Sequence, residues 1–218
     1  MPRAYHSPRR EAEAAATRAG IVAAAARLFI RDGYAATSMK AIAAEAGVSA
    51  QTVQLHGPKH ALLIAAFETS FAGDEGTHSL TERPLIAEIM AEPQFETALE
   101  RYVAFLTEAN RRSAAIVQAM MAAADADAAA RAAYLELEER RQRDMRLSAG
   151  WFASRGRIPE AAVDVTADVL GHLTGPATYL HFTHARGWSN EQYAAWVSTQ
   201  LTHLSAALPP ADRKSTRL

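Results

Sequence analysis

The chain has 218 residues, a formal net charge of -1 and no cysteine. This length allows one sizeable core, or a small module attached to a larger one. Without cysteine, disulfide bonds, thiolate zinc sites and cysteine nucleophiles are excluded. The N-terminus lacks the apolar segment of a secretion signal, and no run approaches the roughly 18 apolar residues that a membrane span requires. We therefore expect a cytoplasmic protein that does not enter a membrane.

The charge is distributed unevenly along the chain. Residues 1–60 carry a net charge of +4, whereas residues 61–218 carry -5. A short basic module therefore precedes a larger acidic one, and a basic module is a feature of nucleic-acid binding.

Apolar residues recur at three- and four-residue spacing in an alanine-rich chain, which predicts an all-α protein. The first predicted helix covers residues 11–32 and has a single apolar stripe. Gly33 follows it, at the position where a left-handed helix cap is favoured. The stripe consists of Ile21, Ala24, Ala25, Leu28 and Phe29.

Three shorter helices are predicted next. Thr37 or Ser38 can cap a helix that ends near residue 45, and Ser49 can cap another that ends near residue 56. Pro58 begins a fourth helix.

Further helices are predicted over residues 59–72, 94–110, 113–123, 126–154, 159–185 and 189–207. Ser189 and Gln192 form a capping box at the start of the last one. Its apolar seam consists of Tyr193, Trp196, Val197, Leu201, Leu204 and Leu208.

Residues 37–56 have the layout of a helix-turn-helix. Ala43 is small where two helices would cross closely, and Gly47 can adopt the positive φ of a tight turn. Val53 is then placed to pack against Ile42. Such a unit inserts its second helix into the major groove of DNA.

The segment from Thr17 to Leu63 resembles the DNA-binding domain of the TetR family. The resemblance implies an all-α protein, with a three-helix helix-turn-helix domain followed by a larger helical domain for ligand binding and dimerisation. The matching elements are Leu28 and Phe29, Gly33 and Tyr34, Thr37 and Ser38, Ile42 and Ala43, and Ala46, Gly47, Val48 and Ser49.

The resemblance also implies roles for individual residues. Gln51 is the strongest candidate to read a base, because its amide can pair with two atoms of adenine. His56 and Lys59 would lie against phosphates. The predicted DNA-binding residues are Thr37, Ser38, Lys40, Ala50, Gln51, Thr52, Gln54, His56 and Lys59.

The sequence departs from the family at the end of the third helix. Gln54 stands where the family usually has tyrosine, and the large residue before the next turn is either deleted or replaced by Gly57. An aromatic phosphate contact and some packing between the third and fourth helices would therefore be missing. The alternative function is a helical ligand-binding or interaction protein with impaired DNA binding.

The chain is expected to have four parts. The N-terminal arm contains Arg3, Arg9 and Arg10, which could contact DNA or simply be solvated. The predicted parts are a basic arm (1–15), a helix-turn-helix DNA-binding domain (16–63), a helical ligand-binding and dimerisation domain (64–208) and a polar tail (209–218).

The larger domain resembles the family's ligand-binding domain only in length and helical content. The resemblance therefore implies a pocket without identifying the ligand. Aromatic and methionine side chains would suit a small apolar or aromatic molecule, although such residues are more often plain core. The predicted ligand-binding residues are Phe105, Met120, Met121, Trp151, Phe152, Tyr179 and Phe182.

Gly171 and Gly175 lie one turn apart, and Pro176 removes a helical hydrogen bond to the carbonyl of His172. A close helix approach and a kink are therefore expected here. The resemblance implies that the last two helices pair with a second subunit, although each seam residue could equally face the core of its own chain. The predicted homodimer contacts are Gly171, Gly175, Trp196, Leu201 and Leu204.

A metal site is not expected. His172, His181 and His184 lie with Asp168 along one predicted helix, and ligands in one line cannot converge on a single ion without another helix. No nucleotide-binding loop or hydrolase motif is present, so we expect neither a cofactor nor an enzyme. The sequence favours a dimeric repressor that a small-molecule inducer releases from operator DNA.

Overall fold

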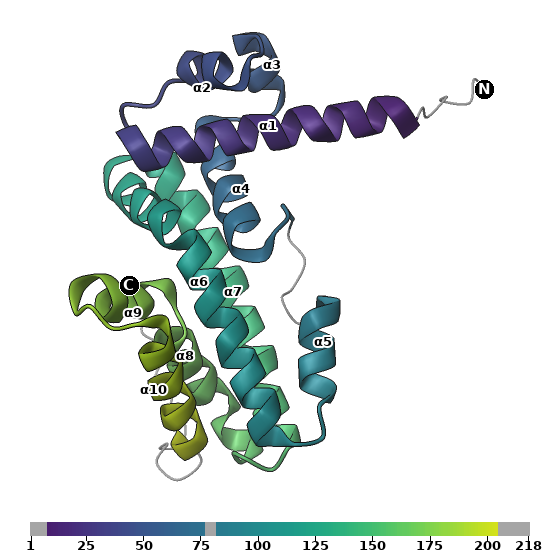
Figure 1. The fold of residues 1–218 in the computed structure, drawn as a ribbon, viewed down its shortest axis with the longest axis vertical. Helices are drawn as coiled ribbons and strands as arrows, with labels where there is room; N and C mark the ends of the chain where they lie inside the picture. Colours follow the sequence, from purple (N-terminus) through teal and green to yellow (C-terminus); the bar gives the residue numbers. More distant parts are fainter. Residues whose placement is uncertain (1–7, 77–81, 205–218) are drawn as a thin grey trace. The chain divides into compact units, whose positions relative to one another are not determined.

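The computed structural model describes residues 8–76 and 82–204. Every regular element in these two ranges is a helix, which confirms the predicted all-α class (Figure 1). Within the same ranges, no helix is both long enough and apolar enough to cross a membrane. Arg3, the tail from residue 209 and the seam residue Leu208 lie outside the described residues.

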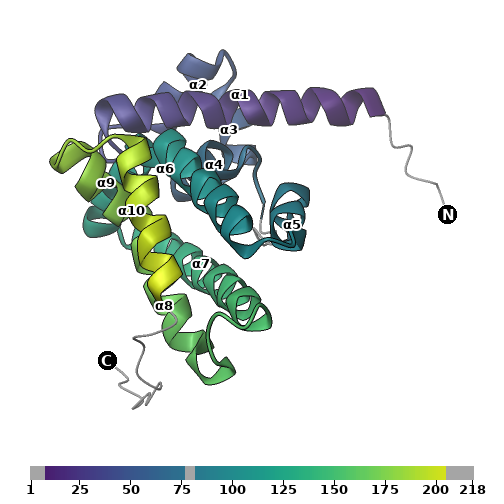
Figure 2. The same cartoon turned by 60° about the horizontal axis from the view of Figure 1, so that its bottom comes forward.

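The chain divides into two compact units. The first unit comprises residues 1–76 and 115–135, and the second comprises residues 77–114 and 136–218. Two long antiparallel helices, α6 (Phe95–Ala126) and α7 (Ala128–Ser154), contribute to both units and run side by side in both views (Figures 1 and 2).

The first unit contains four helices from the N-terminal part of the chain. The predicted apolar stripe of the first helix forms its core, with all five residues at most 3% exposed. The backbone N–H of Gly33 donates to the carbonyl of Phe29, and Gly33 has φ +82°, as predicted for the cap. The helices are α1 (Pro8–Asp32), α2 (Met39–Ala46), α3 (Ala50–Leu55) and α4 (Lys59–Ala72).

The second unit packs shorter helices around the remaining parts of α6 and α7. The predicted capping box of Ser189 and Gln192 is present at the start of the last helix. Besides α6 and α7, the unit contains α5 (Pro84–Ala91), the 3-10 turn η2 (Glu160–Ala162), α8 (Val163–Leu173), α9 (Pro176–Leu180), the π-helical turn η3 (His181–Ala185) and α10 (Asn190–His203).

Two features of this unit were not predicted. No helix was predicted between residues 72 and 94, but α5 begins there at Pro84, which stands in the first turn, where a missing N–H costs nothing. The predicted break between residues 110 and 113 was wrong, because α6 is continuous there. Arg111 donates to Glu108 on the same helix, so these polar side chains support the helix instead of ending it.

The helix predicted over residues 159–185 is interrupted before Pro176. Pro176 has no N–H to donate to the carbonyl of His172. That carbonyl instead accepts from the Thr178 hydroxyl at 2.6 Å and from the Gly175 N–H at 3.3 Å. A Cβ at Gly175 would lie 2.5 Å from the carbonyl oxygen of Gly171, so the turn has no room for a side chain. The expected kink is therefore a complete break between α8 and α9.

Candidate functional site

The helix-turn-helix of α2 and α3 is fixed by caps at each critical position. The Ser38 hydroxyl accepts from the Ala41 N–H at 3.1 Å, and the Ser49 hydroxyl accepts from the Thr52 N–H at 3.0 Å. Between the two helices, Gly47 has φ +68°, a conformation that disfavours any residue with a Cβ. The tight turn predicted from the sequence is therefore present.

One face of α3 is buried and the other is exposed. Val53 and Ile42 are both fully buried, which holds α3 against α2. Ala50, Gln51 and Gln54 are exposed on the opposite side. The residues predicted to face DNA thus lie on the surface of a helix whose inner face is fixed.

Two basic side chains attach the end of α3 and the loop between α1 and α2 to neighbouring helices. Arg18 of α1 donates to the carbonyl of His56, which ends α3, and to the carboxylate of Glu75 at 2.7 and 3.0 Å. Lys59 donates to the carbonyls of Tyr34 and Thr37 at 2.9 and 3.2 Å. Its ammonium also lies 4.1 Å from the centre of the Tyr34 ring.

The predicted DNA-binding residues do not all have free side chains. Thr37 is 2% exposed and its hydroxyl donates to the carbonyl of Gly33, so this side chain belongs to the turn after α1. Thr52 is half-buried, and its hydroxyl lies 2.8 Å from that of Ser49. Lys59 is half-buried and already bonded, as described above. Lys40 is exposed on α2.

Sequence reasoning missed Leu55. Its side chain is 81% exposed at the last position of α3. The signal was available, because Leu55 follows Gln51 by four residues and therefore lies on the same side of the helix.

The turn after α3 accommodates the departure from the expected pattern. Gly57 has φ +117° and its N–H donates to the carbonyl of Gln54 at 3.2 Å. Only glycine adopts such a backbone conformation readily. The helix-turn-helix is thus followed by a defined turn into α4.

Comparison with known proteins addresses this N-terminal unit directly. A family model described as "Bacterial regulatory proteins, tetR family" matches residues 21–66. Residues 21–66 therefore form a DNA-binding region of the type that this family shares. This is a family of regulators, in agreement with the prediction that the chain is not an enzyme. No curated protein matches the chain.

Solved structures share the fold over most of the chain. A protein described as a transcriptional regulator from Pseudomonas aeruginosa PAO1 is 17% identical, with a TM-score of 0.68 over 93% of each chain. A TetR-family protein from Mesorhizobium loti is 22% identical, with a TM-score of 0.66 over 86% of this chain and 94% of its own. A protein described as a transcriptional regulator from Saccharomonospora viridis, solved in complex with choline, is 20% identical, with a TM-score of 0.61 over 87% of this chain and 97% of its own.

The predicted ligand-binding residues of this chain are not brought together as one group. Trp151 and Phe152 make ring contacts with each other and with Phe95. Tyr179 and Phe182 belong to a second group of rings, which is completed by Trp188, Tyr193 and Trp196. Met120 and Met121 belong to the first compact unit, and Phe105 is half-buried in the second.

Buried tyrosines connect the helices of the second unit. Burial raises the pKa of Tyr102 to about 12, and its hydroxyl lies 3.0 Å from that of Ser148 on α7. Burial also raises the pKa of Tyr193, whose hydroxyl donates to the carbonyl of Leu173 at 2.7 Å. Both residues therefore stay neutral in the folded protein at ordinary pH.

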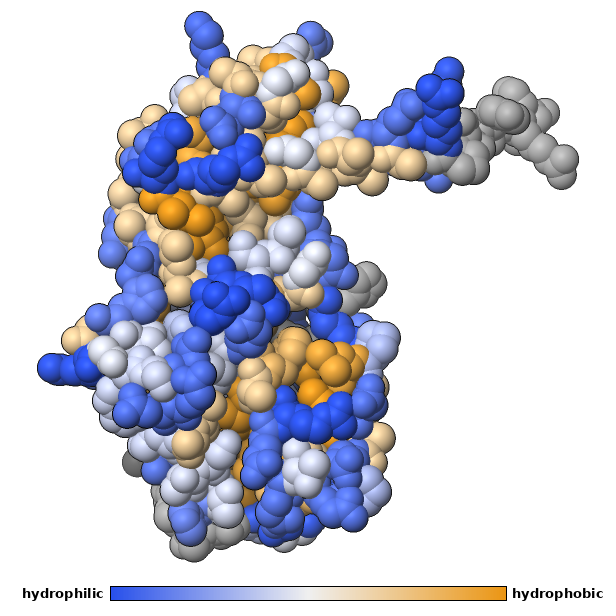
Figure 3. Space-filling model, in the orientation of Figure 1, coloured by the Kyte–Doolittle hydropathy of each residue, from blue (hydrophilic) through white to orange (hydrophobic). Residues whose placement is uncertain are grey.

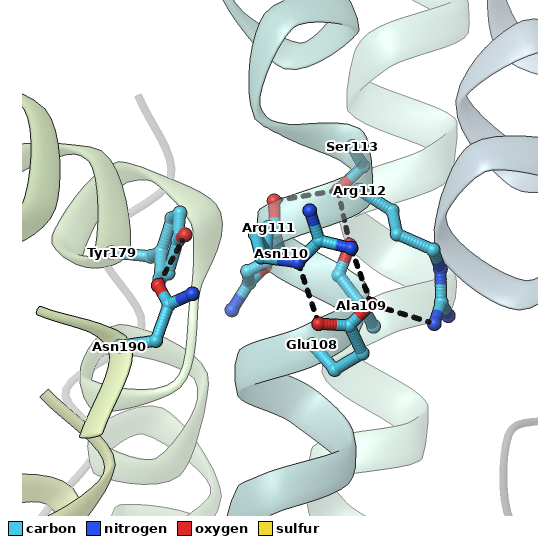
Figure 4. Close-up of polar contacts among 8 residues, drawn as sticks. All are labelled: Glu108, Ala109, Asn110, Arg111, Arg112, Ser113, Tyr179 and Asn190. Carbon is cyan, nitrogen blue, oxygen red and sulfur yellow. Dashed lines mark hydrogen bonds and ion pairs between the residues drawn. The ribbon is translucent and has the colours of Figure 1, made fainter.

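Polar side chains of α6 lie opposite α9 and α10 in the second unit (Figure 4). Arg111 donates twice to Glu108, at 2.6 and 2.7 Å, and these bonds lower the pKa of the Glu108 carboxyl. Across from this pair, the Tyr179 hydroxyl is 2.8 Å from Oδ1 of Asn190. Burial raises the pKa of Tyr179, while the nearby Arg111 opposes that change.

Two buried oxygen atoms on α6 lack hydrogen-bond partners among the described residues. They are Oγ1 of Thr107 and Oδ1 of Asn110. Asn110 is completely buried and its amide Nδ2 donates to the carbonyl of Thr174 at 2.8 Å. Because these two residues are three positions apart on α6, their side chains lie on one side of the helix.

Two open grooves adjoin each other between α7 and α8, with volumes of about 300 and 610 Å³. Charged side chains of α7 and α8 line both, and an ion pair between Arg146 and Asp164 at 2.8 Å belongs to both. Neither of these two grooves is lined by a predicted ligand-binding residue.

The predicted dimer contacts mostly lie within the chain itself. Leu201 and Leu204 are 2% and 9% exposed, so they pack in the core of their own unit. A Cβ at Gly171 would lie 3.5 Å from Met145 of α7, so the predicted close approach occurs within one chain. Trp196 is half-buried in the second ring group and keeps some surface for a partner.

Within the part of the chain that the structure describes, no three side chains of the metal-binding types come together.

Proposed function

We propose that the protein is a dimeric transcriptional repressor that binds operator DNA through α3 and leaves it when its second unit binds a small molecule. The observation that carries the proposal is the outer face of α3. This face is exposed, while the helix is capped by Ser49 and attached to α1 by Arg18. A rigid helix with a free polar face suits the major groove.

The proposed roles of the basic residues follow from their contacts. Lys40 is exposed and supplies a phosphate contact at the start of α2. Lys59 instead holds the loop between α1 and α2 through two carbonyls. The exposed side chain of Gln51 makes no hydrogen bond with the other described residues, and its amide reads adenine. His56 lies at the end of α3, where it approaches a phosphate.

The proposal keeps the domain division predicted from the sequence. Residues 16–63 bind DNA, residues 64–208 bind the ligand and form the dimer, and the arm and tail flank them. Two copies of α3 must reach successive major grooves, about 34 Å apart, which requires a dimer. Of the predicted contacts, Trp196 and Gly171 are half-buried, and Trp196 offers part of its ring to a partner.

The sensor role is supported by two observations. The similarly folded protein from Saccharomonospora viridis was solved in complex with choline. In this chain, Thr107 and Asn110 each keep a buried oxygen atom without a partner among the described residues. A buried acceptor costs free energy unless it is hydrogen-bonded. A small ligand with hydroxyl or amine groups would satisfy these two acceptors.

The DNA-binding proposal is tested by selecting duplexes from a random library with the full chain. We expect one enriched sequence with two-fold symmetry, whose half-sites are spaced by about one helical turn or a multiple of it. If no sequence is enriched, the DNA-binding proposal is contradicted. The alternative of an interaction protein is then favoured, in agreement with Gln54 at the position where the family usually has tyrosine.

Two variants then separate base contacts from phosphate contacts. Lys40→Ala should weaken binding to every duplex and reduce the slope of log affinity against log salt by about one for each subunit. Gln118→Ala, an exposed glutamine on α6, serves as the control and should bind DNA like the unmodified protein. An unchanged salt slope for Lys40→Ala would contradict the proposed phosphate contact.

Choline is the first probe for the sensor role. If it is an inducer, it should raise the midpoint of thermal unfolding and lower the affinity for the selected duplex. Asn110→Leu should remove both effects while leaving DNA binding in the absence of choline intact. No shift and no loss of DNA affinity would exclude choline, and a library of small amines and alcohols would be screened next.

A further inference from the structure

Leu55 is exposed beyond what packing explains. Its side chain is 81% exposed, whereas the next most exposed large apolar side chain in the described ranges, Leu135, is 55% exposed. A scattered leucine on a surface is ordinary. This one, however, ends the helix whose outer face is proposed to enter DNA.

The position of Leu55 places it beside the proposed base reader. Leu55 follows Gln51 by four residues, so the two side chains lie one above the other on the same side of α3. The separation along the helix axis is about 6 Å. The other exposed residues of α3 are Ala50 and Gln54, so Leu55 is the one large apolar side chain on this face.

We propose that Leu55 contacts the C5-methyl group of a thymine in the major groove and thereby selects an A·T base pair at that position of the operator. The inference rests on the proposed DNA binding by α3. Thymine is the base that presents a methyl group in the major groove, and apolar side chains recognise it there. A phosphate would leave the apolar side chain without a suitable partner.

The geometry also places this base pair within the half-site. Successive base pairs are about 3.4 Å apart along the DNA axis. A separation of about 6 Å on α3 therefore corresponds to about two base pairs. The selected thymine should lie within about two base pairs of the adenine that Gln51 reads.

The test uses the duplex selected from the random library. Each thymine of one half-site, and its symmetric mate, is replaced by uracil, which removes only the methyl group. Affinities are measured for the unmodified protein, for Leu55→Ala and for Leu135→Ala. Leu135 lies on α7 and its substitution removes the same atoms from an exposed leucine outside the helix-turn-helix.

We expect uracil at one position of each half-site to weaken binding of the unmodified protein and of Leu135→Ala by about fifteen-fold, because the dimer loses two methyl contacts that each contribute about four-fold. Leu55→Ala should bind the thymine duplex more weakly by a similar factor and show no further loss with uracil. Its thermal unfolding should match that of the unmodified protein, because the truncated atoms are exposed.

Two results would overturn the inference. One is that no thymine-to-uracil replacement near the Gln51 position changes the affinity. The other is that Leu55→Ala remains as sensitive to uracil as the unmodified protein. If the library yields no enriched sequence at all, the proposed DNA-binding function itself fails, and this inference fails with it.

Discussion

The helix-turn-helix and the C-terminal part of the second unit are built in different ways. In the first, Ser38 and Ser49 cap the starts of α2 and α3 through their hydroxyls. In the second, neither α8 nor α9 begins with a side-chain cap, and the chain between them is held by contacts around Gly175. Side-chain caps therefore begin both helices of the DNA-binding module, whereas the break between α8 and α9 depends on a close approach of the backbone at Gly175.

The substitution with the largest expected effect on stability is at Gly175, in the break between α8 and α9. In Gly175→Ala the new Cβ would meet a backbone oxygen at 2.5 Å, and backbone cannot move aside easily. We expect the free energy of unfolding to fall by about 2–3 kcal/mol. Urea denaturation followed by tryptophan fluorescence measures this directly, because all three tryptophans lie in the second unit.

Gly171→Ala is the matched control for this change. Its Cβ would meet only side-chain atoms of Gln142 and Met145, at 3.4 and 3.5 Å. Alanine also favours the helix by up to about 1 kcal/mol relative to glycine. A stability loss as large as that of Gly175→Ala would show that the break before Pro176 does not depend on the absence of a side chain at Gly175.

The corresponding change in the first unit is Lys59→Met. The apolar stem is retained, while the ammonium that bonds the carbonyls of Tyr34 and Thr37 is lost. We expect the free energy of unfolding to fall by about 1.5–2 kcal/mol. The loss of the helical circular dichroism signal during denaturation measures it. Lys40→Met removes an exposed charge and should change stability by less than about 0.5 kcal/mol. Equal losses would refute the structural role of Lys59.

The burial of Tyr102 in the second unit should make the stability of the protein depend on alkaline pH. The pKa of Tyr102 is about 12 in the folded protein and about 10 when unfolded, so its stabilising contribution is complete below pH 10 and is lost as the pH rises toward 12. Tyr102→Phe should therefore flatten the fall of stability above pH 10 by about 1.4 kcal/mol per pH unit. Denaturation curves at a series of alkaline pH values test this, and identical slopes would contradict the burial of the hydroxyl.

The smallest predicted effect on stability concerns the carbonyl of His172, near the C-terminal end of α8. Thr178→Val removes the hydroxyl that donates to the carbonyl of His172, and should cost about 1 kcal/mol. Thr199→Val removes a hydroxyl that bonds the Ala195 carbonyl on the exposed side of α10, and should cost less than about 0.5 kcal/mol. The same fluorescence measurement compares them; a ranking in the opposite order would contradict the proposed cap.

The sequence was informative wherever structure depends on near neighbours. The caps of α2, α3 and α10, the positive φ of Gly33 and Gly47, and the stripe of α1 follow from residues three to eight positions apart. The continuity of α6 is an exception, because it was missed although Glu108 and Arg111 are only three positions apart.

The candidate sites show the same division. The exposed face of α3 was predictable from helical periodicity, although the apolar member of that face, Leu55, was overlooked. The side-chain contacts of Lys59 and Thr37 were not predictable, because they join carbonyls and side chains across turns. The aromatic residues of the second unit divide into two ring groups, which no pattern along one helix could indicate.

The most direct test of the central claim, that α3 reads DNA sequence, is the ratio of affinities for the selected duplex and a scrambled duplex at one salt concentration. We predict that Gln51→Ala lowers this ratio by about ten-fold or more while its affinity for the scrambled duplex stays unchanged, and that Gln118→Ala keeps the full ratio. An unchanged ratio for Gln51→Ala, or an equal loss on both duplexes, would contradict the claim.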